Sequence, residues 1–431
     1  MKVYEYPDRS TWGELLTRPT HDAADLNATV AQVLNAVKER GDGAVREYEE
    51  RFDHVVLDTL LVSEEEMAEA ETLVSQELKD SLVLAHENIR KFHAAQEFQG
   101  VRVEVVQGVE CWQKSVAIQK VGLYIPGGTA PLFSTVLMLA TPARIAGCEE
   151  IVLCTPPNRE GKVNPAILVA ARIAGVGRIY KIGGVQAIGA MAYGTESVPK
   201  VYKIFGPGNQ YVMCAKQQVS LHDVAIDMPA GPSEVCVLAD ESSNPAFVAA
   251  DLLSQAEHGA DSQVLLITTN AGLIQDVQSE VERQLNELSR SDIAARALEN
   301  SKIILVRTDE EMMELSNLYA PEHLIIETKN YMELAGQVVN AGSVFLGSWT
   351  PESAGDYASG TNHTLPTHGY AVSYNGVNLD SYMRKITFQH ISSDGVEKIG
   401  PAVVCMARGE MLDAHGNAMQ LRINEVKKTL K

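Results

Sequence analysis

The pattern of apolar and polar residues changes twice along the chain. From Asp22 to about Gln99 it is helical and rich in charge, with few strand signals. The segment LNATVAQVLNAVKERG predicts an amphipathic helix that ends near Gly41, a residue type that commonly follows helices. The apolar residues that share one face of this helix are Leu26, Val30, Val33, Leu34 and Val37.

After Val116 the pattern changes to short β-branched runs that alternate with helices. The runs VGLYIPGG, IVLCTPP, RIYKIGG and KVYKIFGPG predict strands that end in glycine or proline turns. Helical segments such as NPAILVAARIAG and GNQYVMCAKQQVSL lie between them. This alternation indicates βαβ units and a parallel sheet.

A second block of the same kind follows. The runs SEVCVLAD, SQVLLITT, SKIILVRT, HLIIET and GSVFLG predict strands, and NPAFVAADLLSQAEHG predicts a helix. The two blocks predict an α/β protein with two separate parallel sheets. A short polar lead-in covers residues 1–21, and a polar and then helical tail begins near Tyr374.

Length and composition limit the class of protein. A chain of 431 residues suggests two or three domains, at roughly 150 residues each. The formal net charge of −20 disfavours binding to nucleic acid or to an anionic membrane. The chain begins without the apolar core of a signal peptide and has no run of eighteen apolar residues, so no membrane span is expected. Six cysteines without a CxxC pair indicate reduced, mostly buried thiols and a cytoplasmic location.

The helix predicted over residues 244–259 carries two candidate metal ligands near its end. Asn244 is expected to cap this helix, and Pro245 suits its first turn. Gln255 and His258 are three residues apart, so both are expected to project from one face. A carboxamide oxygen and an imidazole can form half of a metal site. A solvated helix end with a capping histidine explains the same residues.

Glu322 and His323 form a candidate acid–base pair between a predicted helix and the strand HLIIET. Histidine titrates near neutrality, and open α/β sheets place their chemistry at the carboxyl ends of strands and in nearby loops. An ordinary loop is the alternative. The segment PESAGDYASGTNHTLP follows another predicted strand and contains Glu352, Asp356 and His363. This density of ligand-type side chains favours a binding loop over a plain turn.

Other segments carry weaker signals. In RGEMLDAHGN, Glu410, Asp413 and His415 would not share one narrow helical face, so a turn is expected there, and an exposed helix start explains the segment. The turns YIPGG, GGVQ and FGPGN each follow a strand and precede a helix, as phosphate-binding loops do. None matches G-x-G-x-x-G, so alone they are ordinary turns. PAGPSE, just before a strand, also reads as a turn.

Together these segments resemble the histidinol dehydrogenase family along almost the whole chain. The resemblance is carried, in this order, by VGLYIPGGTAPLFSTVLMLATPARIAGC, KIFGPGN, IDMPAGPSEV, LLSQAEHG, PEHLII and PESAGDYASGTNH. The first twenty residues and the tail beyond Lys427 contribute little to it. His368 is assigned no role, and residues 395–402 do not align with the family.

The resemblance implies one Zn²⁺ per subunit, and the implied ligands are Gln255, His258, Asp356 and His415. Zn²⁺ accepts nitrogen and oxygen donors, and this set contributes one formal negative charge. In the family the remaining positions bind the imidazole nitrogen and the amino group of the substrate. The expected role of the metal is therefore mainly to orient the substrate.

The resemblance also implies an NAD-dependent oxidation of L-histidinol to L-histidine through bound histidinaldehyde, the last steps of histidine biosynthesis. Glu322 and His323 match the acid–base pair of the family. His323 is expected to remove the hydroxyl proton, and Glu322 is expected to activate water. Because water is the nucleophile, no thioester cysteine is required, and the expectation for the cysteines is a structural role.

Further residues match binding positions of the family. Those that match NAD-binding positions are Tyr124, Gln186 and Asn209. Those that match substrate contacts, in addition to the zinc ligands and His323, are Ser233, Glu352, His363 and Glu410.

The fold that the resemblance implies is two incomplete Rossmann-like parallel-sheet domains with small N- and C-terminal extensions. It implies an intertwined homodimer, in which Glu410 and His415 enter the site of the other subunit. The expected segments are an N-terminal extension at 1–21, a zinc, substrate and catalytic domain at 22–123 plus 237–373, an NAD-binding domain at 124–236 and a C-terminal dimer-exchange segment at 374–431.

Three other functions remain open at this point. A related dehydrogenase on the same scaffold would oxidise another small polar alcohol. A zinc hydrolase would use Glu322 on a metal-bound water and would need no NAD. A binding protein without catalytic activity would use the same pockets.

Overall fold

The structure is a computed structural model, and the residues that it describes are 1–19, 24–127 and 131–429. Gly128, in the first of the predicted glycine-rich turns, lies outside the described residues. The chain divides into two compact units, which are Met1–Gln96 with Ile118–Tyr382 and Glu97–Ala117 with Met383–Lys431.

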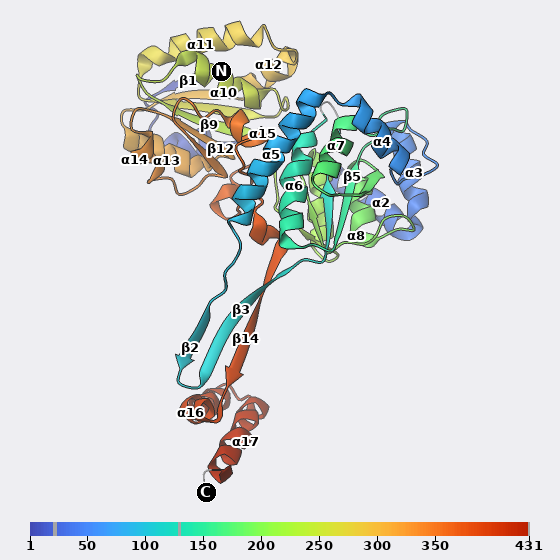
Figure 1. Cartoon of the computed structure of the whole chain (residues 1–431). Coiled ribbons are helices and arrows are strands. Elements are labelled where there is room, and N and C mark those ends of the chain that lie inside the picture. The colour runs from blue at the N-terminus through green and yellow to red at the C-terminus, as the bar shows by residue number, and fades with distance from the viewer. Residues whose placement is uncertain (20–23, 128–130, 430–431) are drawn as a thin grey trace. The chain divides into compact units, whose positions relative to one another are not determined.

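The first unit contains a five-stranded parallel sheet (Figure 1). Its strands are β4 (Lys120–Tyr124), β5 (Glu150–Thr155), β6 (Arg178–Lys181), β7 (Lys203–Phe205) and β8 (Ala225–Ile226). Their order is β6-β5-β4-β7-β8, so the chain leaves the central strand β4 in both directions. Ligands of open α/β sheets bind beyond the carboxyl ends of the strands at such a switch point.

Helices cover both faces of this sheet because its strands are apolar on both sides. Val121 and Leu123 of β4 belong to one core, and Tyr124 belongs to the other. The helices of the first core are α4 (Glu64–Leu73), α5 (Gln76–Ala94), α6 (Phe133–Ala146) and α7 (Pro165–Ile173). Those of the second core are α2 (Ala24–Arg40), α3 (Asp42–Tyr48), α8 (Gly184–Tyr193) and α9 (Gln210–Ser220), and the π-helical turn η2 (Glu49–Asp53) follows α3.

The same unit contains a six-stranded parallel sheet of order β1-β11-β10-β9-β12-β13. Its strands are β1 (Lys2–Glu5), β9 (Glu234–Ala239), β10 (Gln263–Thr268), β11 (Lys302–Leu305), β12 (His323–Glu327) and β13 (Ser343–Leu346). Val235 and Val237 of β9 face one core, whereas Cys236 and Leu238 face the other. Both faces of this sheet are therefore buried as well.

Each face of the six-stranded sheet has its own helices. On the first face lie α10 (Pro245–Ala256), α11 (Ala271–Leu285) and α12 (Ser291–Glu299). On the second face lie α1 (Trp12–Leu15), α13 (Asp309–Tyr319) and α14 (Tyr331–Ala335). The remaining short elements of the unit are η1 (Arg9–Thr11), α15 (Glu352–Tyr357), η3 (Tyr370–Val372) and η4 (Leu379–Tyr382).

The second unit is built on an antiparallel sheet of order β14-β3-β2. Its strands are β2 (Arg102–Val106), β3 (Val109–Ala117) and β14 (Met383–Ile391), and two helices follow, α16 (Ser393–Gly409) and α17 (Asp413–Thr429). Val396 and Val404 of α16 pack against Ile423 of α17. Glu410 and Met411 form the turn between the helices, and Met411 has a φ of 59°. The turn expected in this segment is confirmed.

The prediction of an α/β protein with two parallel sheets is confirmed. The helix predicted to end near Gly41 does so, because the Gly41 N–H donates to the Val37 carbonyl oxygen at 2.9 Å and Gly41 has a φ of 54°. The helices of residues 24–94 lie against the five-stranded sheet. The domain boundaries and the homodimer stay predictions. Among the described residues, no helix has the length and apolar character needed to cross a membrane.

The six cysteines are free thiols, and four of them are buried, as expected. Burial raises the pKa of the Cys148 thiol to about 12 and also raises that of Cys154. Both side chains therefore stay protonated and unreactive at neutral pH.

Candidate active site

Glu322 and His323 lie at the amino end of β12, inside the six-stranded sheet. Helix α13 ends at Ala320, which has a φ of 50°, and Pro321 leads into the strand. His323 is the first residue of β12 and pairs with Val235 of β9. The pair therefore lies between a helix and the strand HLIIET, as predicted, and at the amino end of that strand. The candidate chemistry of this sheet gathers at this amino edge.

The buried side chain of Gln255 contacts both members of this pair. Its Nε2 atom lies 3.2 Å from Glu322 Oε2 and 3.2 Å from His323 Nδ1. Gln255 is the second-last residue of α10, which Asn244 caps as predicted. The Gln255 Oε1 atom is buried and has no hydrogen-bond partner among the described residues. This oxygen is a candidate ligand atom for a metal.

Glu322 is also held by the start of the neighbouring strand. Its Oε2 atom accepts a hydrogen bond from the Glu234 N–H at 2.9 Å. The Glu234 carboxylate in turn accepts two hydrogen bonds from Arg18, of 2.5 and 2.8 Å. Sequence reasoning missed Glu234 and Arg18, although a glutamate at the head of the apolar run EVCVLA was a possible signal. The lead-in residue Arg18 thus supports the amino edge of the sheet.

Carboxylates surround the ring of His323. Its Nε2 atom lies 3.5 Å from Asp356 Oδ1, and its Nδ1 atom lies 3.6 Å from Glu322 Oε2. Burial lowers the pKa of His323, but the charges of Glu352 and Glu322 and the hydrogen bond with Asp356 outweigh burial. The pKa of His323 therefore lies well above its usual value, and the carboxylates favour the imidazolium form.

Helix α15 carries Glu352 and Asp356 one helical turn apart, so both side chains lie on one face. The Glu352 side chain is buried, and its Oε2 atom has no hydrogen-bond partner among the described residues. Burial and the neighbouring carboxylates raise the pKa of Glu352 to about 8, although the His323 charge opposes them. Burial also raises the pKa of Asp356, but the hydrogen bond from His323 prevails, so this pKa lies below its usual value.

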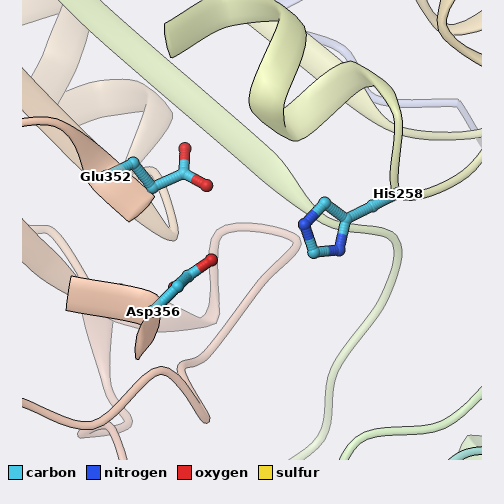
Figure 2. A group of neighbouring side chains, drawn as sticks. All are labelled: His258, Glu352 and Asp356. Atoms are coloured by element: carbon cyan, nitrogen blue, oxygen red, sulfur yellow. The ribbon is translucent and has the colours of Figure 1, made fainter. Parts of the chain in front are cut away.

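His258 completes a cluster with Glu352 and Asp356, and the three side chains point toward a common space (Figure 2). One nitrogen of His258 and one oxygen of each carboxylate all lie within 4.8 Å of one another. His258 is exposed and follows the end of α10, so it does not share a helical face with Gln255. An imidazole nitrogen and two carboxylate oxygens are a donor set that suits Zn²⁺.

This cluster overlaps with the predicted zinc ligands only in part. It unites His258 and Asp356, which were both predicted as ligands, with Glu352, which was predicted only as a substrate contact. The spacing of four residues between Glu352 and Asp356 was a signal for this, because it places two carboxylates on one helical face. The donor set and the unpartnered Gln255 Oε1 atom together fit a divalent cation.

His363 contacts the backbone of Asp356 and the side chain of Thr135. Its Nδ1 atom is 2.9 Å from the Asp356 carbonyl oxygen, and its Nε2 atom is 3.0 Å from Thr135 Oγ1 of α6. Burial lowers the pKa of His363, so the neutral ring is favoured. A carbonyl oxygen can only accept, so Nδ1 carries the hydrogen and Nε2 accepts from the Thr135 hydroxyl. This link ties the loop after α15 to a helix of the five-stranded sheet.

Ser233 immediately precedes β9, and its carbonyl oxygen accepts a hydrogen bond from the Gln263 N–H at 3.2 Å. The residue lines a small pocket together with Arg18, Glu234 and His368. Ser233 is thus next in sequence to Glu234, whose N–H holds Glu322.

The residues predicted to bind NAD lie on the five-stranded sheet. Tyr124 ends β4, and its hydroxyl accepts a hydrogen bond from the Gly184 N–H at 3.1 Å. Gln186 lies in the first turn of α8 and is buried, and its Oε1 atom has no partner among the described residues. Asn209 caps α9, where its side chain accepts from the Tyr211 and Val212 N–H groups. All three lie at the carboxyl edge, where a dinucleotide is expected to bind.

The turn before Asn209 is held by a buried ion pair that sequence reasoning missed. Lys216 Nζ lies 2.5 Å from Asp227 Oδ1, and both side chains are almost fully buried. Lys216 donates to the Gly206 carbonyl oxygen at 2.7 Å, and the Gly206 N–H donates to Asp227 at 2.8 Å. Both polar groups of the Gly206 backbone are therefore fixed by charged partners. A lone lysine on an amphipathic helix had no feature that predicted this.

Glu410 and His415 belong to the second unit, and both side chains are exposed there. Glu410 caps the end of α16, and His415 lies in the first turn of α17. Their expected roles as a substrate contact and a zinc ligand stay predictions. The structure thus groups the site residues into two sets at the edges of two sheets and places these two residues in a separate unit.

Two parallel sheets, each with polar side chains gathered at one edge, and a cluster suited to a cation define an α/β enzyme with a candidate metal centre. The family model described as histidinol dehydrogenase matches residues 16–423. The histidinol dehydrogenase of Bacteroides fragilis is 65% identical over 428 residues, which cover 99% of this chain and 100% of the relative. That of Bacteroides thetaiotaomicron is 65% identical over 427 residues, again 99% and 100%.

A solved structure agrees with these relatives. The crystal structure of histidinol dehydrogenase from Elizabethkingia anophelis has a TM-score of 0.97 and 51% identity, and 99% of each chain is covered. The chain belongs to the histidinol dehydrogenase family, whose members are oxidoreductases.

Proposed function

We propose that this protein oxidises L-histidinol to L-histidine with two molecules of NAD⁺ and one Zn²⁺ per subunit. The observation that carries the proposal is the position of Gln255. Its Nε2 atom contacts the Glu322–His323 pair, and its unpartnered Oε1 atom is available to a cation near the cluster of His258, Glu352 and Asp356. A group that orients the substrate and an acid–base pair thus meet in one place.

The residues that we propose to hold the metal are Gln255, His258 and Asp356, with His415 of the partner subunit. When bound, Zn²⁺ orients the imidazole and the amino group of the substrate and only secondarily acts as a Lewis acid. The carboxylate of Asp356 that faces the cation also helps to raise the pKa of His323. A bound cation offsets the charge of Asp356 and so weakens the interaction that keeps His323 protonated. The neutral form of His323 can then accept a proton.

The acid–base steps follow from the positions of the two side chains. His323 accepts the hydroxyl proton of the alcohol as a hydride leaves the same carbon. Glu322 then accepts a proton from the water that adds to the aldehyde, and His323 accepts a proton from the resulting diol in the second oxidation. NAD⁺ supplies the hydride acceptor for both steps. In total the alcohol and one water lose two hydrides and three protons, which gives the carboxylate.

Substrate and cofactor are proposed to bind on different sheets of the first unit. The residues proposed to contact the substrate are Ser233, Glu352 and His363, with Glu410 of the partner subunit. The residues proposed to bind NAD are Tyr124, Gln186 and Asn209. Support for the cofactor site comes from the switch point between β4 and β7, beside which Tyr124 and Asn209 stand.

We propose that the enzyme is a homodimer that exchanges its C-terminal segments. Support comes from the second unit, which exposes large apolar side chains of its helices. Met406 is 66% exposed, Met411 86% and Leu421 59%. Exposed apolar side chains in such number favour contact with another protein surface.

Steady-state kinetics on a panel of small alcohols tests the proposed substrate. We expect histidinol to have the highest kcat/KM and histidine to accumulate as the product. Faster oxidation of a sulfonated or other polar alcohol would assign the protein to a different activity on the same scaffold. Turnover without NAD would favour the zinc hydrolase.

A further inference from the structure

Dinucleotide-binding sheets usually carry an acidic residue that binds the adenosine ribose. In such sheets this acid follows a neighbouring strand of the sheet, and its carboxylate accepts hydrogen bonds from the ribose hydroxyls. In the five-stranded sheet the second strand in chain order is β5, which ends at Thr155 and is followed by Pro156, Pro157 and Asn158. This segment has no acid. The usual partner of the ribose is thus missing from its usual place.

Two acidic residues that follow helix α3 lie at the carboxyl edge of the five-stranded sheet. Glu49 and Asp53 are the first and last residues of the π-helical turn η2. A Cβ atom built on Gly183, just after β6, would lie 3.3 Å from Asp53 Oδ2 and 2.8 Å from Pro156 Cβ. Asp53 therefore stands where the ends of β5 and β6 meet. Single turns of π-helix are rare and are often found at functional sites.

The two acids determine how Gln186 is oriented. Glu49 Oε1 accepts hydrogen bonds from the Gln186 Nε2 atom at 2.8 Å and from the Gly183 N–H at 2.9 Å. Asp53 Oδ2 lies 3.3 Å from the same Gln186 Nε2 atom. Since the amide nitrogen faces two carboxyl groups, the Gln186 Oε1 atom points away from them. It lies 3.0 Å from the point where a Cβ on Gly184 would be, so only a glycine leaves that space open.

Two polar atoms of this group lack hydrogen-bond partners among the described residues. Gln186 Oε1 and Glu49 Oε2 are buried without a hydrogen-bond partner, and both side chains are fully buried. Burial and the Asp53 charge raise the pKa of Glu49 to about 8, so its carboxyl group is mostly protonated at neutral pH. Asp53 is only partly buried and can meet a ligand. The group thus offers the two oxygens of the Asp53 carboxylate as acceptors, which suits two adjacent hydroxyl groups.

We propose that Asp53 binds the 2′,3′-diol of the adenosine ribose of NAD, that Glu49 and Gln186 position it, and that this acidic subsite selects NAD against NADP. The inference rests on the proposed use of NAD and adds Asp53 and Glu49, which nothing else assigns to the cofactor. Sites for NADP ordinarily provide an arginine for the 2′-phosphate. Here the Asp53 carboxylate lies 3.3 Å from the Gln186 Nε2 atom, and the neighbouring charged side chain is that of His54. A 2′-phosphate at this place meets the negative charge of Asp53.

Calorimetric titration of the zinc-loaded enzyme with NAD and with NADP, in the absence of alcohol, tests the subsite without turnover. The variants are Asp53→Asn and Asp53→Ala, and Asp58→Asn is the matched control, because Asp58 is an exposed acid of the same segment. We expect the wild type to bind NAD more tightly than NADP. Asp53→Asn should weaken NAD binding about tenfold or more, as the loss of a charge-assisted hydrogen bond does, and should reduce the preference for NAD. Asp58→Asn should leave both affinities unchanged.

A 2′-deoxyadenosine analogue of NAD provides the second arm. It should bind less tightly than NAD to the wild type, whereas Asp53→Ala should bind the two equally, because the lost hydroxyl and the lost carboxylate are partners. If Asp53→Ala still discriminates between NAD and the analogue as the wild type does, the ribose subsite is overturned. A folded wild-type enzyme that binds no NAD at all would instead overturn the proposed function.

Discussion

At the scale of single residues, the surroundings of Glu322 determine what its substitution should do. Glu322→Gln keeps an oxygen that can accept from the Glu234 N–H, but it cannot accept a proton from water. We expect oxidation of the aldehyde to slow by about 10²–10⁴-fold, the usual contribution of a general base, and oxidation of the alcohol to slow less. Single-turnover production of reduced NAD from histidinol and from histidinaldehyde measures the two halves. Equal losses in both halves would contradict the division of roles, and Glu333→Gln, an exposed acid on α14, is the control.

His258→Ala should remove the metal and abolish turnover while the fold is kept. His258 is exposed, so its loss costs little stability, whereas the cluster with Glu352 and Asp356 loses its nitrogen donor. Metal analysis after gel filtration, with circular dichroism for the fold, checks this. The control is His222→Ala, an exposed histidine elsewhere. One zinc per subunit in the His258→Ala protein would refute the ligand assignment.

Single residues also show where sequence reasoning ends. Gln255, His258, Glu322 and Asp356 were selected because of their similarity to a family, and their own spacing explained them equally well as helix ends and loops. Lys216 had no such signal, and the place of Glu234 at the head of an apolar run did not reveal its partner, because a buried charge is recognised only when its partner is known. The partner of Glu234, Arg18, is 216 residues away in the sequence, and the partner of Lys216, Asp227, lies outside its helix.

At the scale of elements, the buried pair of Lys216 and Asp227 supports the turn that leads to Asn209. Lys216→Met should lower the free energy of unfolding by about 3–5 kcal/mol, because it leaves the Asp227 charge buried without its partner. It should also raise the KM for NAD, since the Gly206 carbonyl loses its donor. Urea unfolding and steady-state kinetics measure the two effects, and Lys200→Met on an exposed side chain is the control. Unchanged stability would show that the pair is not structural.

Nine strands of the two parallel sheets could be predicted because they are apolar on both faces and most end in glycine or proline turns. Strand β1 was missed because it lies in the polar lead-in, and β8 was missed because it has only two residues. Strand β14, with the sequence MRKITFQHI, could not be predicted, because most of its side chains are exposed in the chain and alternate without a buried face. The position of Glu322 and His323 before the strand HLIIET could be predicted, but the contacts that make this edge a site could not. Ligands of open α/β sheets usually bind beyond the carboxyl ends of the strands. Here the site lies at the amino end of β12, where His323 contacts Gln255 of α10 and Asp356 of α15.

At the scale of the whole molecule, the proposed exchange of C-terminal segments predicts complementation. His258→Ala and His415→Ala chains are each expected to be inactive. Co-expressed with separate tags and purified as mixed dimers, they should recover up to about half of the wild-type activity per dimer, because one of the two sites then has all its ligands. The doubly tagged His258→Ala homodimer is the control. Mixed dimers without activity would indicate that each site is built within one chain.

The central claim is a four-electron oxidation at one site, and its stoichiometry tests this most directly. A limiting amount of L-histidinol is consumed completely by the zinc-loaded enzyme with excess NAD⁺, and the absorbance of reduced NAD and the amount of histidine are measured together. We expect two equivalents of reduced NAD and one of histidine for each histidinol, without release of aldehyde. One equivalent with free histidinaldehyde, or none, would contradict the claim.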